Sequence, residues 1–158
     1  MGRPRARLDA IFHAAVTGDP WRALPEQFGK PFTVARHFRR LSHAGLWQRL
    51  MYALCHPAAP PALRALEYWI CRAARRAMRL LQMKGIVLAR RLGLYTALPM
   101  WPWMMPDVDL SQTIFARIDR VLARLPAAFP PRGLLTRLGR VLVTAGGRRV
   151  WSRRFAPG

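Results

Sequence analysis

Acidic residues are scarce in this chain. Seven Asp and Glu stand against 27 Lys and Arg among 158 residues, which gives a formal net charge of +20 at pH 7. Only Lys30 and Lys84 are lysines, so arginine carries nearly all of the positive charge. A GC-rich genome raises the arginine content but does not remove acidic residues. Because a strongly basic chain gathers phosphates by releasing counterions, the composition indicates a polyanionic partner.

Cysteine is also rare. Cys55 and Cys71 are too few for a disulfide framework. The Cys55-His56 pair has no second Cys or His pair at the spacing of a zinc site. We therefore expect neither a structural metal nor a cofactor.

Long apolar runs are missing as well. The longest uncharged stretch, 92–106, has about 15 residues with three prolines, whereas a membrane-spanning helix needs about 20 apolar residues. The first residues lack the apolar segment of a signal peptide. The expected location is the cytoplasm, in association with the nucleoid.

Strand-type alternation does not stand out, and helical periodicity takes its place. Thr33 and Ser111 are the expected N-caps of two helices. Gly45 is expected to end the helix that Thr33 begins, and Gly85 to end the helix at 62–84. The predicted fold is all-α, a tri-helical helix-turn-helix domain followed by an irregular helical region. Helices are expected at 5–17, 21–24, 33–44, 46–54, 62–84, 86–92, 110–125 and 133–145.

Prolines suggest where domains end. The segment 56–61 contains three of them and is the best internal boundary. The expected organisation is a DNA-binding domain over 1–55, a helical region of unknown role over 62–145 and a basic tail over 146–158.

The first domain has the pattern of a DNA-binding unit. Two short helices precede a turn and an Arg-rich helix, which in a helix-turn-helix protein lies in the major groove. Arginine suits this role because its guanidinium fork bonds guanine edges or phosphates. The alternative is a helix face that is merely solvated. The predicted DNA contacts are Arg36, His37, Arg39, Arg40 and His43, with Arg3 and Arg5 on an extended arm that reaches the minor groove. The predicted core residues are Trp21, Leu24, Phe28, Val34, Phe38 and Trp47.

An ordered set of residues over 2–51 resembles the amino-terminal domain of bacterial insertion-sequence transposases of the DDE superfamily. The resemblance implies a transposase-derived protein that binds the terminal repeats of its insertion element. The matching residues are Gly2, Arg3, Pro4, Arg5, Thr17, Gly18, Pro20, Trp21, Arg22, Leu24, Pro25, Phe28, Gly29, Thr33, Val34, Phe38, Arg39, Arg40, Gly45 and Trp47.

The chain departs from that family in three ways. Met1 adjoins the Gly-Arg-Pro-Arg segment, where family members usually carry a further helix. Leu41 stands where a Trp is common. A catalytic RNase-H-like domain, whose carboxylate triad holds two metal ions, is not expected, because Asp107, Asp109 and Asp119 have no strands to present them. The chain is therefore expected to be no enzyme.

The helix expected at 62–84 has an arginine face that includes Arg72, Arg75, Arg76 and Arg79. This face could follow a phosphate backbone, be solvated, or lie on an anionic membrane, although membrane binding is the less favoured reading. Residues 62–145 could also pair with a full-length transposase, as an accessory or inhibitory partner, or with a second copy.

Overall fold

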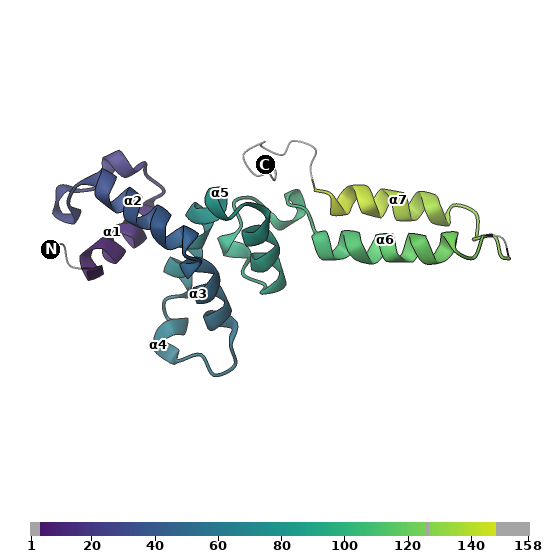
Figure 1. Ribbon diagram of the computed structural model, residues 1–158, viewed down its shortest axis with the longest axis horizontal. Helices are drawn as coiled ribbons and strands as arrows, with labels where there is room; N and C mark the ends of the chain where they lie inside the picture. The colour runs from purple at the N-terminus through teal and green to yellow at the C-terminus, as the bar shows by residue number, and fades with distance from the viewer. Residues whose placement is uncertain (1–3, 126, 148–158) are drawn as a thin grey trace. The chain divides into compact units, whose positions relative to one another are not determined.

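The computed structural model describes residues 4–125 and 127–147 and confirms the all-α prediction, since these residues form helices and no strands. Figure 1 shows their arrangement. The α-helices are α1 (Pro4–Thr17), α2 (Pro31–His43), α3 (Leu46–Cys55), α4 (Pro61–Arg64), α5 (Glu67–Arg91), α6 (Val108–Leu122) and α7 (Leu134–Ala145). Short 3-10 helices are η1 (Trp21–Ala23), η2 (Glu26–Phe28), η3 (Tyr95–Ala97) and η4 (Pro102–Met104).

The chain divides into two compact units between Pro99 and Met100, and not at the prolines of 56–61. The first unit contains α1 to α5, and the second contains α6 and α7. Helix α5 packs against α1, α2 and α3. The boundary expected at 56–61 is therefore a local loop, because the apolar face of the first three helices is covered by residues that follow it.

The core of the first unit has aromatic side chains from α2 and α3 on one side and small side chains from α5 on the other. Phe38 of α2 and Trp47 of α3 are buried with ring centroids 5.6 Å apart. The indole Nε1 of Trp47 donates a hydrogen bond to Ser42 Oγ over 2.9 Å, which satisfies the polar atom of a fully buried side chain. Helix α5 presents Ala73, Ala74 and Ala77, whose short side chains let the other helices approach closely. Of the predicted core residues, Leu24, Val34, Phe38 and Trp47 are buried, whereas Trp21 and Phe28 are half-buried.

Of the two predicted ends of α2, the start is wrong and the end is confirmed. The helix begins at Pro31, two residues before Thr33, and Lys30 occupies the cap position without a side-chain hydrogen bond. Proline fits the first helical position because its φ is fixed near the helical value and its missing N–H has no partner there. Gly45 ends α2 as predicted, with a left-handed φ of 74° that favours glycine.

Gly85 does not end a helix. It is buried within α5, and the break lies three residues earlier at Gln82, where φ is 52° and ψ is −144°. A Cβ built on Gly85 would lie 2.7 Å from Leu81 Cβ and 2.8 Å from Met78 Sδ. Glycine is thus needed here for close packing of the chain against its own preceding turn, and not as a stop signal.

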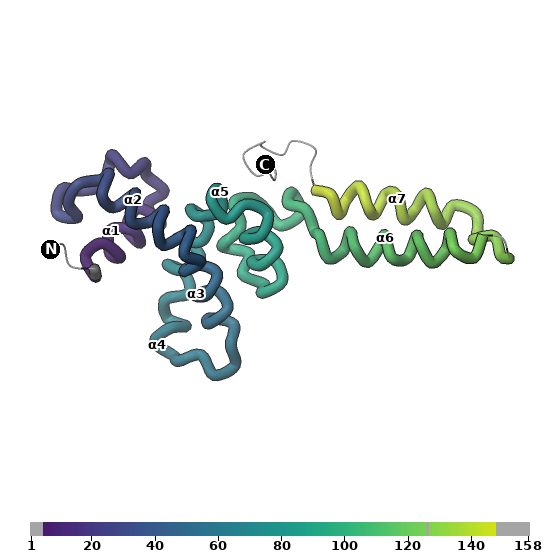
Figure 2. Tube along the Cα trace, viewed as in Figure 1, coloured from purple at the N-terminus to yellow at the C-terminus, as the bar shows by residue number. Residues whose placement is uncertain are grey.

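The second unit is a helical hairpin. Helices α6 and α7 run antiparallel and in contact, as Figure 2 shows. Asp107, and not the predicted Ser111, caps α6, because its Oδ1 accepts a hydrogen bond from the Leu110 N–H over 3.0 Å. The Asp107 N–H donates to the Ala145 carbonyl over 2.7 Å and joins the open end of the hairpin.

Candidate nucleic-acid interface

Helix α2 has one buried and one exposed face. Val34 and Phe38, four residues apart, are turned into the core together with Ser42. On the opposite face the predicted contact residues Arg36, Arg39, Arg40 and His43 are all exposed. Phe32 is exposed on the same face, one turn before Arg36, and was not predicted as a contact.

The two most central arginines of this face are not engaged elsewhere. Within the described part of the chain, neither Arg36 nor Arg39 makes a hydrogen bond or an ion pair. The scarcity of acidic residues explains this, because few carboxylates are present to pair with them. Their guanidinium groups can therefore meet an external anion without first breaking an internal contact.

His37 lies at the edge of the face and is half-buried. Its Nδ1 is 3.1 Å from Nη2 of Arg40, a donor, so the neutral imidazole accepts this hydrogen bond. Burial lowers the pKa of His37, and the positive charges of Arg40 and Arg7 lower it further. While its imidazole is neutral, His37 thus holds the Arg40 guanidinium through this hydrogen bond.

Arg7 was missed by the sequence analysis. It belongs to α1, yet its charge acts on His37 of α2, and α1 packs against α2. The sequence carries no signal for this proximity, since 29 residues separate the two positions. Arg7 therefore adds a cation from a second helix to the edge of the α2 face.

The expected amino-terminal arm is only partly described. Arg3 lies outside the described residues, and Arg5 is an exposed residue of α1. Because α1 begins at Pro4, Arg5 lies in the first helical turn, and the prediction that it stands on an extended arm is wrong. Proline permits this early start since it is tolerated in the first turn of a helix.

The arginine face of α5 has an internal role. Arg72 Nη2 donates to the Val16 carbonyl over 3.0 Å, and Arg76 Nη1 donates to the Ala14 carbonyl over 2.8 Å. Both carbonyls belong to the last turn of α1, which contains no basic residue of its own. The two arginines thus satisfy carbonyls at the negative end of the α1 dipole.

Arg76 also reaches beyond α1. Its Nη2 donates to the Asp19 carbonyl over 2.7 Å, and its Cζ lies 4.1 Å from the ring centroid of Trp21. On the same helix, Arg75 donates to the Pro99 carbonyl over 3.0 Å. Three of the four arginines predicted on this face, Arg72, Arg75 and Arg76, thus donate to backbone carbonyls, whereas Arg79 is exposed.

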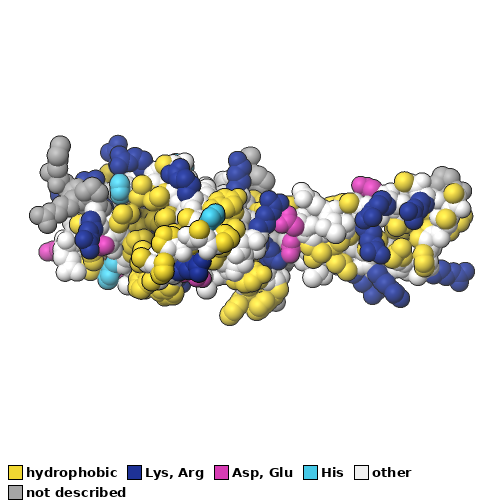
Figure 3. Space-filling view, turned by 90° about the horizontal axis from the view of Figure 1, so that it is seen from below, with side chains coloured by type: hydrophobic (Ala, Val, Ile, Leu, Met, Phe, Trp, Pro, Cys, Tyr) yellow, Lys and Arg dark blue, Asp and Glu magenta, His cyan; other side chains and the backbone are white. Residues whose placement is uncertain are grey.

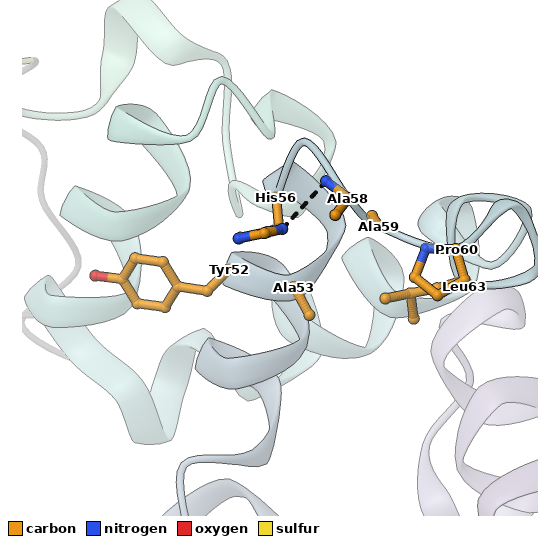
Figure 4. Close-up of a pocket in the computed structure, with 7 residues that line it drawn as sticks. All are labelled: Tyr52, Ala53, His56, Ala58, Ala59, Pro60 and Leu63. Atoms are coloured by element: carbon orange, nitrogen blue, oxygen red, sulfur yellow. Dashed lines mark hydrogen bonds between the residues drawn. The ribbon is translucent and has the colours of Figure 1, made fainter.

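The first unit also contains a shallow apolar pocket, drawn in Figure 4. Its volume is about 390 Å³, and it lies where the end of α3 and the loop before α4 meet. His56 uses its Nδ1 to accept a hydrogen bond from the Ala58 N–H over 3.2 Å. The other lining residues are Tyr52, Ala53, Ala59, Pro60 and Leu63. With its one imidazole holding the loop, the pocket offers no constellation for catalysis.

Carboxylates are not grouped for metal binding. In residues 4–125 and 127–147, no three His, Cys, Asp or Glu side chains lie close enough to hold a metal ion. Asp107 serves as a helix cap. None of the helices in these ranges combines the length and the apolar character needed to cross a membrane.

In the view of Figure 3, the basic side chains of the first unit form separate patches with hydrophobic surface between them. The basic surface seen in this view is therefore not continuous.

A family match covers the amino-terminal part of the chain. Residues 2–51 match the family described as "Putative transposase of IS4/5 family (DUF4096)". The match confirms the resemblance over the same residues, which contain α1, α2 and the first half of α3. Comparison with curated proteins and with solved structures gave no match.

Proposed function

We propose that the first unit binds duplex DNA through α2, at the terminal repeats of an insertion element. The family match over 2–51 supports a transposase-related role. The observation that carries the proposal is the exposed face of α2, where Arg36 and Arg39 stand unengaged in the described part of the chain.

The geometry of α2 suits a groove. A helix fits the major groove of B-DNA, and the guanidinium fork bonds two acceptors of a guanine edge or a phosphate. Arg36 and Arg40 are four residues apart on the exposed face, so both would face the same groove. Arg5 and Arg7 lie on α1, which packs beside α2, and would contact the neighbouring phosphates.

Binding is proposed without strand cleavage. Transposase chemistry needs metal ions held by clustered carboxylates, and no such cluster occurs in the described ranges. A chain that binds the repeats without cutting them would act as an accessory or inhibitory partner of a full-length transposase. This role would also leave the second unit available for protein contacts.

A salt series tests the proposal. The protein is titrated into labelled duplex carrying the element's terminal repeat and into a scrambled duplex, at several salt concentrations. Each lost phosphate contact lowers the slope of log affinity against log salt by about 0.9. The variants are Arg36→Ala, Arg39→Ala and Arg40→Ala. A lost base contact weakens binding by about 1–3 kcal/mol and relaxes sequence preference.

Arg22→Ala is the matched control. Arg22 is an exposed arginine of η1 in the same unit, and its removal changes the net charge by the same amount. If the α2 variants and the control bind repeat DNA with the same affinity, the affinity depends on net charge in general, and α2 is not the interface. Equal affinity for repeat and scrambled duplexes would refute recognition of the element's ends.

A further inference from the structure

The helical hairpin of the second unit does not bury its own apolar residues. In α6 only Ile114 is buried, and in α7 only Ala145. Phe115 and Leu122 of α6 are 53% and 44% exposed, and Leu135 of α7 is 40% exposed. Large hydrophobic side chains therefore remain in contact with water along both helices.

The apolar residues of the two helices follow a heptad pattern. The sequence places apolar residues at the a and d positions that form the seam of an antiparallel pair. They are Ile114, Ile118 and Val121 in α6, Leu125 just beyond the end of α6, and Leu134, Leu138, Val141 and Ala145 in α7. Of these, Val141 remains 43% exposed. A pair of helices needs apolar residues at these positions only.

Both helices carry further apolar residues at the e position. These are Phe115 and Leu122 in α6 and Leu135 and Leu142 in α7. In an antiparallel pair the e positions of both helices lie on the same side of the seam, so the four side chains form one face, here called the e face. Apolar a, d and e positions are typical of helices in a larger bundle.

The opposite edge of the hairpin is basic. The g positions include Arg117 in α6 and Arg137 in α7, and Arg124 continues this edge just beyond α6; all three are exposed. Figure 3 shows several basic side chains over the hairpin. These charges lie on the side of the seam opposite to the e face, so they do not oppose contact through the e face.

We propose that the e face binds the e face of a second copy of this chain, so that two hairpins form a four-helix bundle. Two more helices complete such a bundle, and a second hairpin supplies both with the same apolar pattern. An isologous contact also keeps the arginine edges of both copies outside. An anionic partner, by contrast, would be recognised by the arginine edge and would leave Phe115 and Leu122 uncovered.

The size of the face sets the strength of the dimer. Helices of 15 and 12 residues are about 22 and 18 Å long, and two packed helices are about 20 Å wide. The face then covers about 400 Å² in each copy, below the usual size of stable interfaces. We therefore expect a weak, reversible dimer and not a permanent one.

Sedimentation equilibrium of the whole chain at about 5–500 μM, in moderate salt, tests this inference. The parent is expected to show a reversible monomer–dimer equilibrium. Leu122→Glu places a charge in the e face and is expected to raise the dissociation constant at least tenfold. Leu122→Ala keeps the helix intact and is expected to weaken dimerisation less. Circular dichroism of each variant shows whether the helices persist.

Arg117→Ala is the control, because Arg117 is an exposed residue on the arginine edge of α6, and its removal should leave the dimer unaltered or slightly stronger. A parent that stays monomeric at all concentrations overturns the inference. So does a Leu122→Glu variant that retains its helix content and dimerises like the parent. A monomeric parent that binds phosphatidylserine vesicles through Leu122 would replace the second copy by a membrane.

Discussion

Replacement of Arg76 by Ala should loosen α1 from the rest of the first unit. The Arg76 guanidinium donates to the carbonyls of Ala14 and Asp19 and lies over the ring of Trp21. Its removal leaves the Ala14 and Asp19 carbonyls without their cationic donor, while Arg72 still donates to the Val16 carbonyl. The change therefore acts on the helix that supports α2.

The magnitude follows from these contacts. A hydrogen bond from a charged donor contributes about 1.5–3 kcal/mol, and a cation–π contact about 0.5–2 kcal/mol. Burial of the guanidinium opposes part of this gain, and it lowers the pKa of Arg76, as does the nearby charge of Arg79. We expect a net loss of about 2–4 kcal/mol, a large part of the stability of a small domain.

Hydrogen exchange measured by mass spectrometry locates the effect. A loss of 2–4 kcal/mol lowers protection by about thirtyfold to a thousandfold where exchange follows unfolding of the unit. Peptides from α1 and η1 should show this loss, while peptides from α6 and α7 serve as an internal reference in the second unit. Arg76→Lys should keep part of the protection, because lysine retains the charge but lacks the two-pronged donor geometry.

Arg79→Ala is the matched control on the same helix, since Arg79 is exposed and makes no such contact. It should change stability by less than about 0.5 kcal/mol. Equal protection of α1 in the parent and in Arg76→Ala would refute the reasoning that α5 stabilises the end of α1.

Three further changes test other parts of the structure. Gly85→Ala should destabilise the first unit by about 1–3 kcal/mol through overpacking against Leu81 and Met78, measured by urea unfolding, and a neutral result would show that the chain relaxes there. The lowered pKa of His37 means that the neutral form stabilises the fold, so its contribution is present above the unfolded pKa near 6.5 and is lost as pH falls through the folded value. Phosphates beside His37 would raise its pKa, so DNA affinity should increase as pH falls from about 7.5 to 5.5. The variant His37→Gln should show a weaker dependence of DNA affinity on pH. If the dependence is the same in parent and variant, DNA does not bind beside His37. Exposed Cys55 should react with a thiol reagent in the native protein, slowly because burial and Glu67 raise its pKa, whereas buried Cys71 should react only on unfolding; equal rates would contradict the burial of Cys71.

The sequence by itself determined the features that depend on neighbours along the chain. The 3.6-residue periodicity gave an all-α fold, and the left-handed preference of glycine marked the end of α2 at Gly45. The separation of Val34 and Phe38 from Arg36 and Arg39 also follows from spacing, so the exposed basic face of α2 could be predicted. The limits of this reasoning appear at Thr33 and Gly85, where a proline and a close contact outweighed the local preference.

Only the tertiary structure decided which arginines remain available. Arg36 and Arg76 both lie on helices with basic outer faces, and spacing does not distinguish them. Arg76 meets carbonyls of α1 and the ring of Trp21, more than fifty residues away in the chain, while Arg36 meets no partner in the described residues. A guanidinium bonds any acceptor that packing brings within reach, and packing between distant segments depends on the whole core and not on the local pattern.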